Sequence, residues 1–128
     1  MPDNSNNKVA VIDDDPAMLK SLQSLLESAG YTAGAYSSAV AFLKDRVSQP
    51  ACLITDLNMP EMTGLELAAK LRTEGSNIPV LLFSGRVSPT IISRATELGI
   101  NKVVEKPAPG SELVRFVAAH IKSRCLNC

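Results

Sequence analysis

The sequence has few of the residue types on which many catalytic and disulfide-stabilised proteins depend. It contains one histidine and three cysteines among 128 residues. The histidine, His120, lies among apolar residues at helical spacing, which disfavours a catalytic triad or a histidine-based metal site. Cys52 falls in a predicted buried strand and the cysteine count is odd, so we expect no disulfide framework. Cys125 and Cys128 have the spacing of a metal or redox pair, but no second pair completes a zinc site.

An excess of charge of one sign and long apolar runs are also missing. The 13 basic and 13 acidic residues balance, so the sequence predicts no strongly basic surface for nucleic acid or membrane. No apolar run approaches the ~20 residues of a membrane-spanning helix, and the polar start of the chain lacks the apolar core of a signal peptide. We therefore expect a cytoplasmic protein that binds neither membranes nor nucleic acid directly.

The sequence does have enough apolar residues for one hydrophobic core. Hydrophobic residues make up 45% of the chain and charged residues 20%, the balance of a folded globular protein. We predict one domain over residues 8–122, preceded by a flexible segment at 1–7 and followed by a tail at 123–128.

Short apolar runs alternate with segments whose apolar residues repeat at helical spacing. The predicted strands are Lys8–Ile12, Tyr31–Tyr36, Ala51–Thr55, Ile78–Phe83 and Ile100–Val104. A helix is predicted after each strand, with starts near Asp15, Ser37–Ser38, Thr63, Ser88 and Pro109–Ser111. Because parallel neighbours need crossover helices, this alternation predicts an α/β fold, a doubly wound parallel sheet of five β–α units.

Polar residues follow four of the predicted strands. Asp13 and Asp14 follow the first strand, Asp56 the third, Ser84 the fourth, and Lys106 comes shortly after the fifth. Each is ordinary by itself, as a helix cap, turn residue or surface charge. The carboxyl ends of parallel strands meet at one edge of a sheet, where ligands bind in open α/β folds. We therefore expect these five side chains to converge.

The combination of residue types indicates phosphoryl chemistry. Three neighbouring carboxylates repel one another and require a cation, and Mg²⁺ prefers such hard oxygen ligands. Lys106 adds a second positive charge and Ser84 a hydroxyl group, which together suit the stabilisation of a phosphoryl group. Asp56 is the candidate nucleophile, because a carboxylate can form an aspartyl phosphate.

Four segments together resemble the response-regulator receiver domain of two-component signalling. They are Val11–Asp15, Thr55–Pro60 with Gly64, Leu82–Gly85 and Glu105–Pro107. The resemblance extends from about Lys8 to Ile121. It implies the flavodoxin-like three-layer fold with strand order 2-1-3-4-5 and a signalling switch rather than an enzyme with an external substrate.

The resemblance also implies roles for individual residues and partners. Asp56 is the implied phosphoacceptor. The implied magnesium site consists of Asp13, Asp14, Asp56 and the Asn58 backbone carbonyl. Ser84 is the implied switch hydroxyl, and Lys106 is the implied lysine that pairs with the phosphate. The phosphoryl donor is a sensor histidine kinase or a histidine phosphotransfer protein. The implied output surface comprises the fourth helix, fifth strand and fifth helix, through which a homodimer is also expected.

The sequence departs from this family at two positions. Val103 stands where the family usually has an aromatic residue that moves inward on activation, and a β-branched side chain has too little rotamer freedom for such a movement. Ala108 replaces the phenylalanine that commonly follows the Lys-Pro pair. The loop before the fourth helix is then expected to carry the signal, while Arg86 and Asn58 flank the site and control water access.

Three other functions are compatible with parts of the pattern. A magnesium-dependent phosphatase of the haloacid-dehalogenase type also uses an aspartyl phosphate, but its two acids are two residues apart on the first strand, whereas Asp13 and Asp14 are adjacent. A flavodoxin-like cofactor protein shares the topology, but Asp13–Asp15 would repel its phosphate. A receiver that acts as an adaptor regardless of phosphorylation shares every motif.

Overall fold

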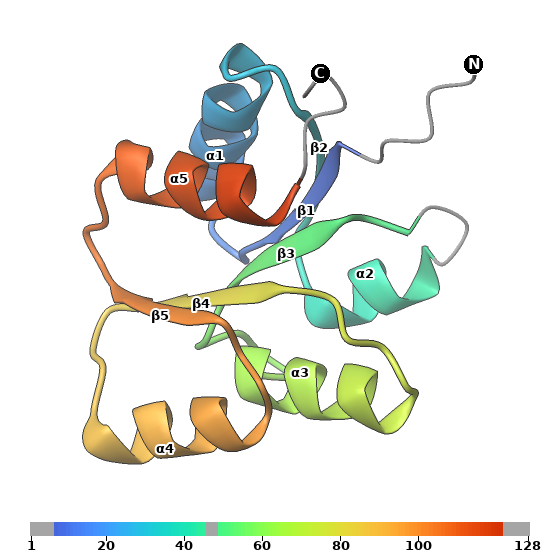
Figure 1. Ribbon diagram of the computed structural model, residues 1–128, viewed down its shortest axis with the longest axis vertical. Helices are drawn as coiled ribbons and strands as arrows, with labels where there is room; N and C mark the ends of the chain where they lie inside the picture. Colours follow the sequence, from blue (N-terminus) through green and yellow to red (C-terminus); the bar gives the residue numbers. More distant parts are fainter. Residues whose placement is uncertain (1–6, 46–48, 122–128) are drawn as a thin grey trace.

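The computed structural model describes residues 7–45 and 49–121, which form a five-stranded parallel sheet between two layers of helices (Figure 1). The strand order is β2-β1-β3-β4-β5, which confirms the predicted fold class. The strands are β1 (Lys8–Ile12), β2 (Thr32–Tyr36), β3 (Cys52–Asp56), β4 (Val80–Ser84) and β5 (Lys102–Glu105).

Five helices connect and follow the strands. They are α1 (Pro16–Ser28), α2 (Ala39–Lys44), α3 (Gly64–Thr73), α4 (Pro89–Glu97) and α5 (Gly110–His120). The first four begin at the predicted caps, because the side chains of Asp15, Ser38, Thr63 and Ser88 each accept a hydrogen bond from a backbone N–H of the first turn. Helix α5 begins after Pro109 without a side-chain cap.

Side chains of the strands alternate between two hydrophobic clusters, one on each face of the sheet. One cluster lies beneath α1 and α5 and contains Val9, Val11, Cys52, Ile54, Leu81, Phe83 and Val104. The other lies beneath α2, α3 and α4 and contains Ala10, Ile12, Leu53, Val80 and Leu82. Because helices cover both faces, the central strands read as continuous apolar runs in the sequence.

Element boundaries differ from the prediction by one or two residues where backbone pairing extends past the apolar run. Asp56 and Ser84 are the last residues of β3 and β4, and β5 begins at Lys102 rather than Ile100. Ile100 instead donates its backbone N–H to the Ala95 carbonyl and closes the end of α4.

The single histidine is a helix residue, as the sequence predicts. His120 is half-buried at the end of α5, where its ring packs against Phe116 and its Nδ1 lies 2.9 Å from the Phe116 carbonyl. Phe116 itself is buried, because it lies one helical turn after Leu113 and on the same face of α5.

Some sequence predictions concern residues that the structure does not describe. The tail at 123–128 with Cys125 and Cys128, and most of the segment 1–7, lie outside the described residues, so the domain bounds stay a prediction.

Cys52 is fully buried, and burial raises the pKa of its thiol to about 12. Across residues 7–45 and 49–121, no helix is both long and apolar enough to cross a membrane.

Candidate functional site

The parallel register brings the predicted polar residues to one edge of the sheet. Ile12 of β1 pairs with Thr55 of β3, so Asp13 and Asp56 follow side by side. Asp56 in turn pairs with Phe83 of β4, and Ser84 pairs with Glu105 of β5, directly before Lys106. The site is therefore built by four neighbouring strands that end together.

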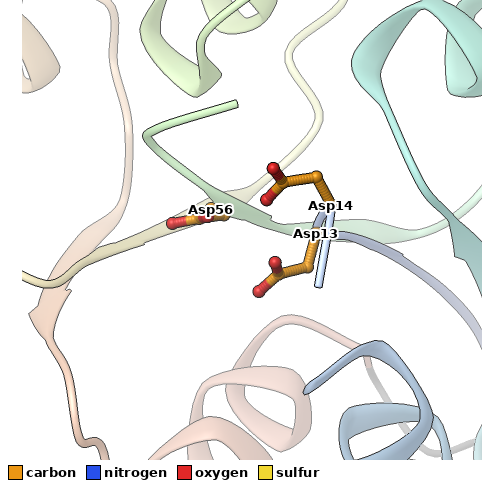
Figure 2. A group of neighbouring side chains, drawn as sticks. All are labelled: Asp13, Asp14 and Asp56. Atoms are coloured by element: carbon orange, nitrogen blue, oxygen red, sulfur yellow. The ribbon is translucent and has the colours of Figure 1, made fainter. Parts of the chain in front are cut away.

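Figure 2 shows Asp13 and Asp14 at the end of β1 and Asp56 at the end of β3. One carboxylate oxygen from each of the three residues lies within 4.8 Å of those of the other two. Asp13 and Asp56 are 1% and 5% exposed, whereas Asp14 is exposed. The Asp13 carboxylate is held in place because its Oδ1 accepts a hydrogen bond from the Asp15 backbone N–H at 2.9 Å.

Lys106 supplies a positive charge to both buried acids. Its Nζ lies 3.4 Å from Asp56 Oδ1 and 3.6 Å from Asp13 Oδ2. The backbone N–H of Lys106 donates to the Ser84 carbonyl at 2.7 Å, which holds the start of the β5–α5 loop against β4, and the Lys106–Pro107 peptide bond is cis. The ammonium group thus bridges acids that come from two different strands.

This one ammonium group does not balance the buried negative charge. Burial raises the pKa of Asp56, and the neighbouring Asp13 carboxylate raises it further, against the opposing effect of Lys106. Burial likewise raises the pKa of Asp13, although the Asp15 N–H and Lys106 oppose the shift. The ionised pair is therefore costly to keep, which favours binding of an additional cation.

The donor set fits a hard divalent cation such as Mg²⁺. The side chains of Asp13, Asp14 and Asp56 offer carboxylate oxygens, which Mg²⁺ prefers. Asp13 Oδ2 is buried and, apart from the Lys106 ammonium 3.6 Å away, has no hydrogen-bond partner within the described part of the chain, which suits it to coordinate a cation. Asn58 is exposed in the loop between β3 and α3, and the contribution of its backbone carbonyl stays a prediction.

The Ser84 hydroxyl is bound by the backbone of Arg86 rather than by the acidic group. Ser84 Oγ donates to the Arg86 carbonyl at 2.9 Å and accepts from the Arg86 backbone N–H at 3.2 Å. It also belongs to the alternation of Val80 and Leu82, on the face of the sheet opposite to that of Phe83. The structure thus gathers Asp13, Asp14, Asp56 and Lys106, while the Ser84 hydroxyl is engaged within the β4–α4 loop.

Two residues have a larger part in the geometry than the sequence suggests. The Lys106 ammonium lies over the Phe83 ring, 4.7 Å from its centroid, although Phe83 reads only as a core residue of an apolar run. At Gly64, a Cβ atom would lie 2.5 Å from the Asp56 carbonyl oxygen, so the first turn of α3 packs directly on the end of β3. Strand alternation is the signal that could have identified Phe83, since it places its ring on the same face as Lys106.

Comparisons with known proteins agree with this arrangement. Residues 9–118 match the family model described as response regulator receiver domain. The chain is 36% identical over 115 residues to the response regulator protein TodT of Pseudomonas putida, covering 89% of this chain and 51% of TodT. It is 36% identical over 114 residues to the transcriptional regulatory protein FixJ of Azorhizobium caulinodans, covering 88% of this chain and 54% of FixJ.

A solved structure supports the fold in the same way. The response regulator receiver domain protein from Methanospirillum hungatei is similar with a TM-score of 0.83 at 22% identity, covering 90% of this chain and 93% of that one. The chain spans about half the length of the curated relatives it matches. The family model matches most of the chain, and the acids after β1 and at the end of β3 lie beside the lysine after β5, so this chain belongs to the response regulator receiver domain family.

Proposed function

We propose that Asp56 accepts a phosphoryl group and that the β4–α4 loop then changes its conformation to signal onward. One observation carries the proposal. Asp56 presents a buried carboxylate at the end of β3, with Lys106 Nζ 3.4 Å from its Oδ1 and with oxygens of Asp13 and Asp14 close by. This surrounding suits a nucleophile whose product carries additional negative charge.

Response regulators receive phosphoryl groups from histidine kinases. For this chain, the donor is a phosphohistidine on a sensor kinase or on a histidine phosphotransfer protein. A carboxylate oxygen of Asp56 forms the new bond to phosphorus as the phosphorus–nitrogen bond breaks, and the imidazole leaves with the bonding electron pair. Lys106 pairs with a phosphoryl oxygen and neutralises part of its charge.

Asp13, Asp14, Asp56 and the Asn58 backbone carbonyl would hold Mg²⁺, which when bound neutralises charge on phosphoryl oxygens and carboxylates. The chain's own residues orient the reacting carboxylate. Gly64 packs against the Asp56 carbonyl, and the Gly64 backbone N–H donates to the Leu57 carbonyl at 2.9 Å. The nucleophile is thereby supported by α3 as well as by the sheet.

The switch begins with the two hydrogen bonds between Ser84 and Arg86. A dianion on Asp56 attracts the Ser84 hydroxyl, which has to leave the Arg86 backbone to reach it. Phosphorylation therefore favours a second arrangement of the loop that leads into α4, as a shift between two populations. Because Val103 is β-branched, this loop carries the signal without a large side-chain rotation at position 103.

The output surface is the face formed by α4, β5 and α5. Ile92 on α4 is 49% exposed, and no other large hydrophobic residue is exposed in the part of the chain that the structure describes. The end of α4 is fixed, because the Arg72 guanidinium donates to the Leu98 and Gly99 carbonyls, so movement is expected at the end that adjoins Ser84. The expected homodimer pairs two copies through this face.

The most direct test is intact-mass measurement after incubation with acetyl phosphate and Mg²⁺. The wild-type chain should gain the mass of one phosphoryl group, and Asp56→Asn should gain none. Asp45→Asn is a matched control, because Asp45 is an exposed aspartate that accepts a hydrogen bond from Tyr36, as an asparagine also can. This control should be phosphorylated like the wild type.

Amide spectra and sedimentation of the same samples test the output. Phosphorylation should shift resonances of the β4–α4 loop and α4, and should favour a dimer. An adduct that persists in Asp56→Asn contradicts the assignment of the phosphoacceptor. An adduct on Asp56 with no change in the loop would instead favour an adaptor that acts regardless of phosphorylation.

A further inference from the structure

We propose that Phe83 is a positioning residue for Lys106, and that its ring holds the ammonium group between Asp13 and Asp56. The Lys106 Nζ lies 4.7 Å from the centroid of the Phe83 ring, within the range of an attractive cation–π contact. The face of an aromatic ring carries partial negative charge, so the ring adds a third attraction to those of the two carboxylates.

The alternation of the strands explains why these four residues meet. Val11, Ile54, Phe83 and Val104 belong to the cluster beneath α1 and α5. Asp13, Asp56 and Lys106 each follow one of these residues by two positions, with Asp56 at the end of β3 and the other two directly after β1 and β5. The Lys106 ammonium contacts Asp13, Asp56 and the Phe83 ring, which brings the four side chains together on this face. Phe83 also pairs in register with Asp56, so its ring lies beside the strand that carries the nucleophile.

Packing holds the ring much more firmly than the lysine. Phe83 is 2% exposed, whereas the side chain of Lys106 is 25% exposed and has a long, flexible stem. A cavity of about 180 Å³ borders both residues and is otherwise lined mainly by apolar side chains of α1, Ala108 and the start of α5. Because this cavity lies beside Lys106, and Ala108 contributes only a short side chain to its lining, core packing does not fix Lys106 on that side.

The Phe83 ring therefore holds the Lys106 side chain, which core packing does not fix on the side of the cavity. Without it, the two carboxylates still attract the ammonium group, but the stem can turn toward the cavity or the solvent. Lys106 would then spend less time at the position where a phosphoryl oxygen on Asp56 would be neutralised. This inference rests on the proposed function for its effect on phosphorylation, whereas the position of Lys106 can be measured independently.

Proton NMR of the Lys106 side chain, assigned with Lys106→Arg, tests the position directly. A ring beneath the ammonium should move the Hε resonances of Lys106 upfield of those of the other lysines. Phe83→Leu should return them toward the other lysines, and Phe83→Tyr, which keeps the ring, should restore the wild-type shift. The initial rate of phosphorylation by acetyl phosphate should fall about two- to tenfold in Phe83→Leu and recover in Phe83→Tyr.

Phe42→Leu is the matched control, because it removes a buried ring of α2 that packs on the other face of the sheet. It should lower stability but leave the Lys106 resonances at their wild-type positions. The rate of phosphorylation should stay within about twofold of that of the wild type. Equal slowing in Phe42→Leu, or unchanged Lys106 resonances in Phe83→Leu, overturns the inference. If Phe83→Leu does not fold, the spectrum of the wild type is sufficient, and unshifted Lys106 resonances there overturn the inference. A wild-type chain that takes no phosphoryl group refutes the proposed function, while the NMR comparison still decides the position of Lys106.

Discussion

At the scale of residues, the site concentrates negative charge that its own lysine does not balance. Asp13 and Asp56 are buried, and burial raises the pKa of both above the ordinary value of 3.8. Their ionised forms therefore oppose folding when no cation is bound. The proposed phosphorylation uses these same carboxylates, so this function would come at a cost in stability.

Removal of the Asp56 charge should stabilise the protein in magnesium-free buffer. A raised aspartate pKa means that the folded state binds more protons than the unfolded state between pH 3.8 and the raised value. Stability of the wild type should therefore fall as the pH rises through this interval. Asp56→Asn should flatten that decline and raise the free energy of unfolding at neutral pH by on the order of 1 kcal/mol.

Urea unfolding followed at a series of pH values measures this effect. Asp45→Asn again serves as the control, because it replaces an exposed aspartate that is not part of the group of Asp13, Asp14 and Asp56. A lower stability of Asp56→Asn than of the wild type at neutral pH would show that the Lys106 ion pair outweighs burial and repulsion.

At the scale of elements, the start of α3 supports the end of β3. The Thr63 side chain accepts the Glu66 backbone N–H, and the Glu66 carboxylate accepts the Thr63 backbone N–H, so the helix start is fixed by a capping box. Gly64, the first residue of the helix, can then pack against the Asp56 carbonyl and the Leu82 side chain. The absence of a side chain at position 64 allows this close approach.

Gly64→Ala should displace the helix start from the strand. The added Cβ would lie 2.5 Å from the Asp56 carbonyl oxygen and 2.6 Å from Leu82 Cδ1, which is too close without a backbone shift. We expect a loss of about 1–3 kcal/mol in the free energy of unfolding, measured by urea denaturation, and slower phosphorylation.

Gly85→Ala is the matched control for stability, since a Cβ at position 85 meets no atom within 4 Å and its φ angle is not in the left-handed region. It should change the free energy of unfolding by less than about 0.5 kcal/mol. Equal losses in the two variants would contradict the role of close packing at Gly64.

At the scale of the whole molecule, metal binding and folding should be coupled. Asp13 and Asp14 follow β1 and Asp56 ends β3, so the unfolded chain does not assemble this group of carboxylates. A cation that binds there stabilises the folded state. Mg²⁺ at about ten times its dissociation constant should raise the free energy of unfolding by about 1.4 kcal/mol.

Thermal or urea unfolding with and without Mg²⁺ measures the coupling, with a sodium salt at equal ionic strength as the comparison. Asp13→Asn should lose most of the magnesium effect. If the free energy of unfolding rises equally in Asp13→Asn, or with the sodium salt, Mg²⁺ acts by general screening of charge.

Local signals made most of the fold predictable. Asp15, Ser38, Thr63 and Ser88 are helix caps that can be recognised in the sequence, and the buried strands are short apolar runs. Element ends were less predictable, because pairing with neighbouring strands includes Asp56 and Ser84 in β3 and β4 despite their polarity.

The sequence by itself determined the parallel α/β fold and the meeting of Asp13, Asp14, Asp56 and Lys106. These follow from hydrophobic periodicity and from the rule that parallel strands end at one edge. Only the tertiary structure decided which way the Ser84 hydroxyl turns and that the Phe83 ring lies beneath Lys106. Strand alternation in the sequence gives the face of the sheet on which Phe83 lies, but both contacts depend on strand register and on the packing of side chains from separate elements, which no local pattern in the chain specifies.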